Sequence, residues 1–492
     1  MKPVNKALNS ALKGVIRAGL ARAKKRPVPV LQDAAFDYLP VPKADRFTAG
    51  FGNAPILPDD IDTAKYYIAG YRDNNPARGV IDPQYVSALW LDDGSGRGGV
   101  LFLAFDAVGI LNKDVCRIRG RLAAFRTRTG CRNIMVMSTH DHAGIDTMGL
   151  WGPLPRTGKN KKFMALLYDC AEKAAFAAYE DRRPGTLYHG NIRVPDLQED
   201  IRTPVVYSDT LTRLRFVPED GSREIWFLNF AAHCESLQGC NSLVSADYPC
   251  YLRERIRQQT GAETVYAVGA VGGMISMLVE DENTLRKEHR LLESTRNIGA
   301  RLADYALSVN NDRPLSPTVN YARQEFFVNV ENPLLTAAGM AGIIEVDRYA
   351  RPGRNMPVIK TELTYMEVGD LPLLFLPCEL FPELAYGGAL SAEESATGQG
   401  PEVNPPNLTE TAGAENLVVF GLANDEIGYV IPPNDFFLND ERPYLDKGID
   451  AHGRRHYEET NSAGPGTAEA VSTALQAVMR AVTAAKTRCG AK

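Results

Sequence analysis

Two histidines one residue apart, His140 and His142, stand directly after a short apolar run in the segment NIMVMSTHDHAGID (133–146). A third histidine, His233, follows another apolar run, EIWFLNFAA (224–232). Imidazole nitrogens bind zinc or move protons near neutral pH, and either role fits a His-x-His pair. If the segment is extended, both rings of the pair lie on one side, because side chains alternate along a strand. A histidine after a strand is also a common hydrogen-bonded loop residue, so these residues alone leave both readings open.

Other polar residues also stand just past apolar runs. Glu379 follows LPLLFLPC (371–378), Tyr429 lies six residues after LVVFGLA (417–423), and Gly272, Gly273 and Ser276 follow TVYAVGAV (264–271). The carboxyl ends of strands are where open α/β sheets bind ligands. Zinc takes roughly four nitrogen, oxygen or sulfur ligands, so two histidines, a glutamate and a tyrosine make a credible set.

The elements that would position these residues alternate along the chain. Short apolar runs bounded by Gly, Pro, Asn or Asp are typical of buried strands, and we expect them at 99–110, 133–138, 224–232, 264–270, 371–377 and 417–423. Helical periodicity predicts helices at 114–127, 161–182, 248–259, 288–307 and 466–486. Residues 388–415 are polar and contain Gly and Pro, which predicts a long loop. The alternation predicts an α/β fold with mixed sheets layered with helices.

Composition narrows the class of protein. A net charge of −5 and a pI near 5.9 give no electrostatic case for nucleic acid as a partner. No run of 18 apolar residues exists, so we expect no membrane-spanning helix. The eight cysteines form no CxxC pair, which favours reduced thiols over a disulfide framework. With no signal peptide recognised, we expect a cytoplasmic protein.

The N-terminal segment has a different pattern. Residues 6–26 place Leu8, Leu12, Val15, Ile16 and Leu20 at helical spacing, with basic residues on the other side. Such a helix can lie on an anionic membrane surface, dock on its own protein or dock on a twin subunit. We therefore divide the chain into a basic helix with a Pro-rich lead-in (1–44) and a single α/β catalytic domain (45–492). The sequence does not give the oligomeric state.

Several segments resemble the neutral (non-lysosomal) ceramidase family. STHDHAGIDTMG (138–149) is similar to a THTHSGPGG-like segment that follows a strand in that family. HCESLQGCNSLVSAD (233–247) resembles a second family segment through His233, Ser236, Asn241, Ser245 and Asp247. LPCEL (376–380), GLANDEIGYV (421–430) and HYEETNSAGPGT (456–467) resemble three more, in the same order. Metallo-β-lactamases also place paired histidines after a strand, as HxHxDH, but the Asp–His step is absent after His142.

The resemblance implies a catalytic α/β domain with one Zn²⁺ per chain. Carried over by position, the zinc ligands would be His140, His233, Glu379 and Tyr429. His142 would either contact the zinc ligands without binding the zinc itself or transfer a proton. Arg193, in NIRVP, would correspond to an arginine of the family's NRSP segment.

The segment VGGMISM (271–277) departs from the family pattern. The family places a serine in GDVSPN beside the zinc, and a gapless match puts Ile275 there with Ser276 one residue later. Either the register shifts and Ser276 is the nucleophile, or a zinc-bound hydroxide acts alone. The backbone amides of Gly272 and Gly273 could donate to the developing oxyanion, or these glycines form a tight turn. We also expect no C-terminal immunoglobulin-like domain, and these departures argue against ceramide itself as the substrate.

The sequence thus predicts a zinc-dependent hydrolase that cleaves the amide bond of a small or lipid-like N-acyl substrate. A zinc esterase or lactonase would use the same residues on a different carbonyl. A non-catalytic binding protein on the same scaffold is a third hypothesis, because a fold does not fix a function.

Overall fold

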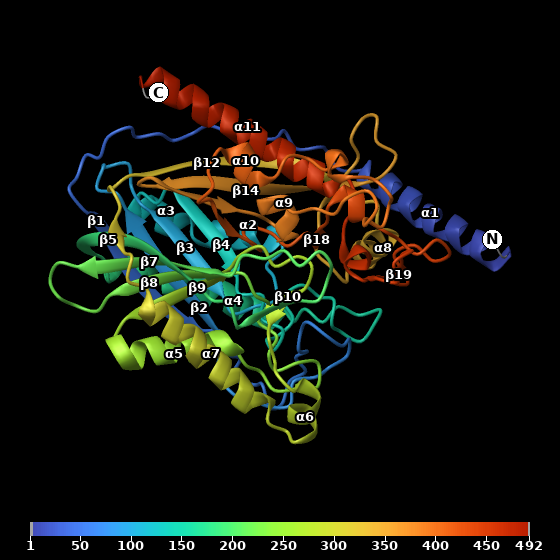
Figure 1. The fold of residues 1–492 in the computed structure, drawn as a ribbon, viewed down its shortest axis with the longest axis horizontal. Coiled ribbons are helices and arrows are strands. Elements are labelled where there is room, and N and C mark those ends of the chain that lie inside the picture. Colours follow the sequence, from blue (N-terminus) through green and yellow to red (C-terminus); the bar gives the residue numbers. More distant parts are fainter. Residues whose placement is uncertain (1–2, 491–492) are drawn as a thin grey trace.

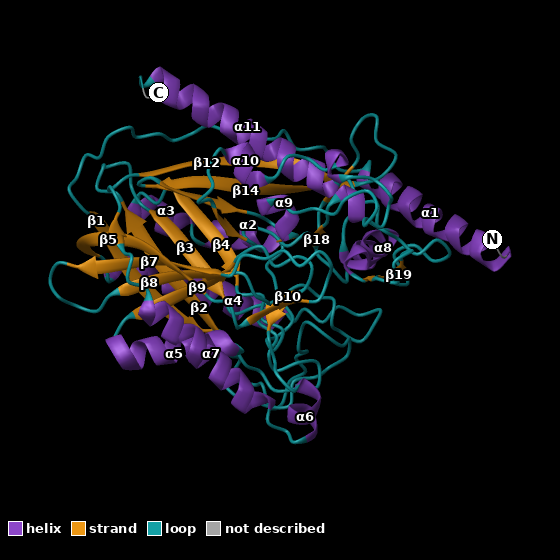
Figure 2. Cartoon of the chain, viewed as in Figure 1, coloured by secondary structure: helices purple, strands orange, loops and turns teal. Residues whose placement is uncertain are grey.

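Two β-sheets packed face to face, with helices on both outer surfaces, form the body of the protein (Figures 1 and 2). The computed structural model describes residues 3–490. Helix α11 (Thr467–Arg488) covers one side of the sandwich, and α5 (Tyr248–Thr260) and α7 (Leu291–Ser308) cover the other. The predicted fold class, mixed sheets layered with helices, is confirmed.

The larger sheet has the strand order β4-β3-β2-β1-β5-β7-β8-β9, with β11 paired to β5. At one end of this order β3 and β4 are parallel, and at the other end β8 and β9 are parallel. All other paired strands of this sheet are antiparallel. The strands are β1 (Phe47–Pro55), β2 (Tyr85–Asp92), β3 (Val100–Phe105), β4 (Asn133–Ser138), β5 (Arg183–Arg193), β7 (Thr210–Pro218), β8 (Ile225–Phe230), β9 (Glu263–Val268) and β11 (Arg313–Pro314).

The smaller sheet has the order β12-β14-β15-β17, with β13 paired to β14 and a parallel pair at β15/β17. Its strands are β12 (Val319–Asn329), β13 (Arg348–Tyr349), β14 (Val358–Val368), β15 (Leu371–Phe375) and β17 (Val418–Phe420). Three short pairs lie outside both sheets. They are β6 (Gln198–Asp200) with β10 (Ile275–Met277), β16 (Glu379–Leu380) with β18 (Tyr429–Val430), and β19 (Gly448–Ile449) with β20 (Arg455–His456).

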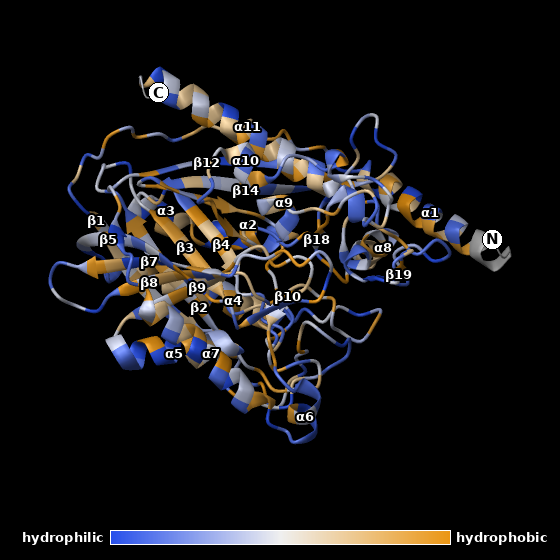
Figure 3. Cartoon of the chain, in the orientation of Figure 1, coloured by the Kyte–Doolittle hydropathy of each residue, from blue (hydrophilic) through white to orange (hydrophobic). Residues whose placement is uncertain are grey.

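An aromatic cluster joins the two sheets. Between the sheets, the ring centroids of Phe102 and Phe375 lie 6.0 Å apart and those of Phe227 and Phe420 lie 5.2 Å apart. Each aromatic side chain buries a large apolar area, so this layer holds the sheets together. The strands are accordingly the most hydrophobic part of the molecule, and the helices are amphipathic (Figure 3).

The remaining helices cover the outer faces or flank the site. They are α1 (Pro3–Ala23), α2 (Asn112–Arg121), α3 (Ala123–Thr129), α4 (Lys161–Glu180), α6 (Glu282–Lys287), α8 (Pro333–Ala341), α9 (Pro382–Tyr386) and α10 (Leu408–Ala412). All six expected strands are present, five of them shorter than expected and β4 with the expected bounds, and all five expected helical stretches are helical, although the first is divided into α2 and α3. The prediction of a continuous loop over 388–415 is wrong at α10, where the side chain of Asn407 accepts from the Glu410 amide and caps a short helix.

Helix α1 docks on its own chain. Gly19 lies against Thr336 of α8, so close that a β-carbon would come within 2.3 Å of the Thr336 methyl group. The lead-in that follows runs beside β12, where the Leu39 amide donates to Asn320 Oδ1 at 2.7 Å. Across residues 3–490, none of the helices combines the length and apolar character needed to cross a bilayer.

Candidate metal centre

The carboxyl ends of five buried strands bring the chemistry-bearing residues together. His140 follows β4, His233 follows β8, Ser276 follows β9, Glu379 follows β15 and Tyr429 follows β17. Direct pairings link these segments outside the sheets, because His233 bridges to Ser276 and Glu379 pairs in register with Tyr429. The structure thus places these five segments next to one another at one edge of the sheets.

Glu379 lies between two histidines at the centre of this cluster. Its Oε2 is 3.2 Å from His140 Nε2 and 3.1 Å from His233 Nε2. His140 Nδ1 donates to the Val108 carbonyl at 2.7 Å, and His233 Nδ1 donates to the Ile275 carbonyl at 2.8 Å. Because a carbonyl can only accept, each Nδ1 carries a proton, and each Nε2 is the ring nitrogen that faces Glu379.

These distances fit one zinc ion. Two tetrahedral ligands at about 2.1 Å from a zinc ion are about 3.4 Å apart, close to the separations observed around Glu379. The ligand atoms of His140, His142 and His233 all lie within 4.8 Å of one another. Zinc-bound histidines usually donate their second nitrogen to a backbone carbonyl or carboxylate, as His140 and His233 do. Nitrogen and carboxylate donors in this arrangement match the metal's preferences.

His142 reaches the cluster by an unexpected route. Its Nε2 is 3.2 Å from His140 Nε2, so the two rings do meet. The prediction of an extended segment is wrong for His140, whose φ of 61° lies in the left-handed region. Two hydrogen bonds hold this backbone turn in place. The His140 ring donates to the Val108 carbonyl, and the Asp141 amide donates to the Ala107 carbonyl at 3.1 Å. Strained backbone of this kind is typical of functional sites.

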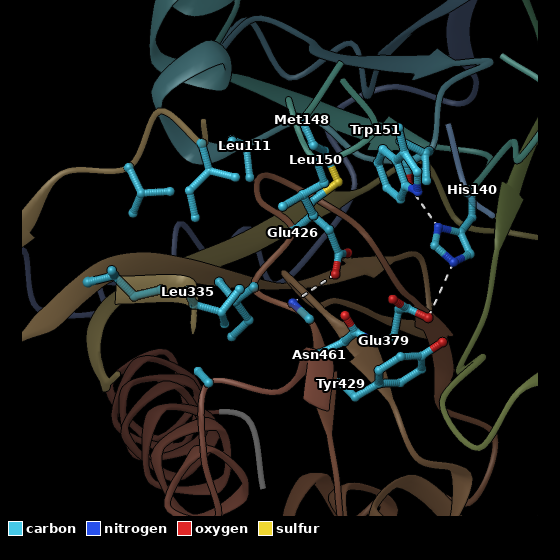
Figure 4. A pocket seen from close by; sticks show the side chains of 18 of the residues that line it. Leu111, His140, Met148, Leu150, Trp151, Leu335, Glu379, Glu426, Tyr429 and Asn461 are labelled. Atoms are coloured by element: carbon cyan, nitrogen blue, oxygen red, sulfur yellow. Dashed lines mark hydrogen bonds and ion pairs between the residues drawn. The ribbon is translucent and has the colours of Figure 1, made fainter. Parts of the chain in front are cut away.

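Tyr429 lies on the other side of Glu379. Figure 4 shows the Tyr429 hydroxyl turned toward the Glu379 carboxylate. This hydroxyl donates to Met274 Sδ at 3.0 Å. Burial and the charge of Glu379 raise the pKa of the Tyr429 hydroxyl, so it is a neutral donor here.

The acidity of the cluster follows from its packing. Burial alone would lower the pKa of His233, but the hydrogen bond to Glu379 and the charge of Glu235 raise it to about 9. Burial and the neighbouring His140 lower the pKa of His142 to about 3. Burial would raise the pKa of Glu379, yet the two imidazoles hold that carboxyl well below its usual range. Two carboxylates, Glu379 and Glu235, thus lie against three closely packed histidine rings, an environment suited to a cation.

Glu235 was missed by the sequence reasoning. It is 6% exposed, and its Oε2 accepts from the Tyr71 hydroxyl at 2.7 Å and lies 3.4 Å from His142 Nδ1. Its other oxygen accepts a short hydrogen bond from Ser276 Oγ. The available signal was the His-x-Glu spacing after β8, because residues two apart in an extended segment face the same side.

The remaining predicted residues are placed as follows. Ser276 is in β10 with its hydroxyl on Glu235, while Ile275 is fully buried. The Gly272 amide donates to the Leu380 carbonyl at 2.9 Å, which corrects the expectation that it is available to an oxyanion. Gly273 has φ 75°, as a tight turn requires. Arg193 has a side chain 79% exposed and pairs with Asp209 at 2.6 Å, and it is absent from the described residues that line the cavity.

Comparison with solved structures identifies the architecture. A neutral ceramidase from Pseudomonas aeruginosa superposes with a TM-score of 0.67 and 17% identity, over 90% of this chain and 75% of that one. A ceramidase complexed with C2 gives a TM-score of 0.65 and 16% identity, over 89% and 76% of the two chains. The chain has the neutral ceramidase fold. No family model and no curated protein matches the sequence.

In this ceramidase fold the candidate metal centre opens into a cavity of about 420 Å³. His140, His142, Glu379 and Tyr429 form part of its wall, and apolar side chains form most of the rest. Figure 4 shows Leu335 across the cavity from His140 and Glu379, with Leu111, Met148, Leu150 and Trp151 along one side. A concave, mostly apolar cavity with a few polar groups at one end is typical of a site for an amphiphilic small molecule.

Proposed function

We propose that the protein is a zinc-dependent hydrolase that cleaves the amide bond of an N-acyl substrate. The observation that carries the proposal is the contact of one buried carboxylate, Glu379, with the Nε2 atoms of both His140 and His233. Likeness to the fold of neutral ceramidases supports the reaction class. The apolar cavity beside these residues supports a substrate with a hydrocarbon segment.

His140, His233 and Glu379 would hold the zinc, with the Tyr429 oxygen as the fourth ligand or as a hydrogen-bond donor beside it. When bound, zinc polarises a carbonyl and lowers the pKa of a bound water from about 15.7 to near 7. The Tyr429 hydroxyl, turned toward Glu379, would donate to the carbonyl oxygen as its negative charge develops.

His142 would move the proton that the leaving amine needs. Glu235 Oε2 lies 3.4 Å from its Nδ1, so the carboxylate fixes the ring and stabilises its charged form. An oriented imidazole of this kind typically contributes about 10²–10⁴-fold to the rate. The Ser276 hydroxyl donates a hydrogen bond to Glu235, and Ser276 is absent from the described residues that line the cavity. Both observations favour water over Ser276 as the nucleophile.

The proposal is tested with acyl p-nitroanilides of increasing chain length and the purified full-length protein. We expect zinc to copurify with the chain, turnover to stop on chelation and zinc to restore it. Glu379→Gln should lose both zinc and turnover, whereas Glu402→Gln, at an exposed position, should keep both. Turnover that survives complete removal of metal would refute the proposal. Matched p-nitrophenyl esters, run in parallel, separate an amidase from an esterase.

A further inference from the structure

A second cavity of about 180 Å³ adjoins the one that holds the metal centre. The two share Ile344, Val346 and Arg348 in their walls. The second cavity is cationic, because Arg22, Arg26, Lys113 and Arg348 line it against two acidic residues, Glu345 and Asp347. The cavity beside the metal centre therefore borders a basic chamber at these three residues.

Most charges in this chamber are already paired. Asp347 contacts both Arg26 and Lys113, and Glu345 pairs with Arg117 at 2.5 Å. Arg22 donates to the Met340 carbonyl at 3.0 Å. Arg348 has no carboxylate within ion-pair distance in the part of the chain that the structure describes, and its one hydrogen bond is a 3.4 Å contact with the Thr336 carbonyl. Arg348 is thus a cation without a direct ion pair among the described residues, and the more distant charge of Asp347 offsets its cationic neighbours only in part.

Packing holds this guanidinium in a defined position. Arg348 lies across Gly339 of α8, where a β-carbon would come within 1.7 Å of Nη1. The arginine can lie there only because residue 339 has no side chain. Burial, together with Arg22 and Arg26, lowers the pKa of Arg348. A half-buried cation among other cations is stabilised by an incoming anion.

Arg348 lies at the end of the cavity away from the metal. Its contact residue, Thr336, is next to Leu335, which Figure 4 shows across the cavity from His140 and Glu379. Between the two ends the wall is apolar, with Val330, Leu335, Ile344 and Val346. A linear molecule that fills the cavity would have its amide at the metal, a hydrocarbon segment in the middle and its far end at Arg348.

We propose that the substrate carries an anionic group, a carboxylate or a phosphate, which Arg348 binds at the end of the cavity opposite the metal centre. This inference rests on the proposed amide hydrolase function and specifies its substrate class. Guanidinium binds carboxylate and phosphate through paired hydrogen bonds, which makes arginine well suited to both anions. Helix α1 contributes Arg22, so docking of this helix adds positive potential to the chamber.

The test compares p-nitroanilides whose acyl chains end in a carboxylate, a phosphate or a carboxamide. The carboxamide matches the carboxylate in shape and lacks only the charge. Over a series of chain lengths, we expect kcat/KM to favour an anionic end by about 10- to 150-fold at the best length. The carboxylate and phosphate arms identify which anion is preferred. Substrates with the anion on the amine side serve as a further arm.

Variants of the arginine assign the effect. Arg348→Gln should bring the ratio of kcat/KM for the anionic substrate to kcat/KM for the neutral substrate close to one. Arg348→Lys should keep part of this preference, because the positive charge remains. Arg354→Gln, at an exposed position of the following loop, should leave the ratio unchanged. Equal turnover of anionic and neutral substrates by the unmodified protein would overturn the inference and leave the amide hydrolase proposal intact.

A binding measurement separates the two proposals. Calorimetric titration with the corresponding N-methylamides, ending in carboxylate or carboxamide, needs no turnover. If no p-nitroanilide is cleaved by the zinc-loaded protein, the hydrolase proposal fails, and the carboxylate should still bind more tightly than the carboxamide in an Arg348-dependent way. Equal affinities for the carboxylate and the carboxamide compounds would refute the anion site, whatever the outcome of the turnover assays.

Discussion

Glu235→Gln is the substitution that examines the role of His142 most closely. Glutamine keeps the shape of the side chain, and its single oxygen can still accept from either the Tyr71 or the Ser276 hydroxyl while its NH2 group donates to the other, but it removes the negative charge 3.4 Å from His142 Nδ1. A hydrogen bond to a charged group contributes about 1.5–3 kcal/mol. If that interaction stabilises protonated His142 in the transition state, its loss lowers kcat by about 10- to 150-fold, at about 1.36 kcal/mol per tenfold.

The assay measures kcat and zinc content on the same preparations. Because Glu235 is not an expected ligand, Glu235→Gln should keep its zinc while turnover falls. The matched control is Glu280→Gln, an exposed carboxylate close in sequence to the site, which should change neither quantity. A variant with full zinc and the kcat of the unmodified protein would refute the view that Glu235 supports proton transfer by His142. Loss of zinc would instead make Glu235 part of the metal site.

Three other expectations follow from contacts in the structure. Ser276→Ala should lower kcat by less than about tenfold, because the Ser276 hydroxyl is committed to Glu235, whereas a loss of about 10³-fold or more would identify it as the nucleophile. Arg253→Met should destabilise the protein by about 3–5 kcal/mol in urea unfolding, because it leaves the fully buried Asp106 carboxylate without its bidentate partner. Arg257→Met, at an exposed position of the same helix, should have little effect, and equal stability of the two variants would contradict this account. Chelation should lower the melting temperature as well as turnover, since a bound ion stabilises the folded state by mass action, and an unchanged melting temperature would argue against a tightly bound metal.

The strands that could be predicted from sequence are those buried on both faces. β4 and β8 have no exposed residue, so they appear as continuous apolar runs between turn residues. β12 and β14 were missed because polar residues interrupt them, for example Glu325, which pairs with Lys360 across the two strands. β1 was missed because Gly50 and Gly52, which allow the close approach of α4, weaken its strand pattern.

The site could be predicted only in part for a related reason. His140, His233 and Glu379 stand just past apolar runs, so their positions alone indicated a shared edge. Glu235 and Arg348 gave no comparable indication, since an acidic residue in a polar loop and an arginine in a charged stretch usually face solvent. Their roles depend on three-dimensional contacts, with Ser276 and Tyr71 for Glu235 and with Gly339 for Arg348.

The central claim is that His140, His233 and Glu379 hold one zinc ion. Anomalous diffraction at the zinc edge, on crystals of the purified protein, tests it most directly. The account predicts a single strong peak about 2.0–2.2 Å from His140 Nε2, His233 Nε2 and a Glu379 oxygen. Zinc-loaded crystals with no peak between these three side chains, or with zinc bound only elsewhere, would contradict it.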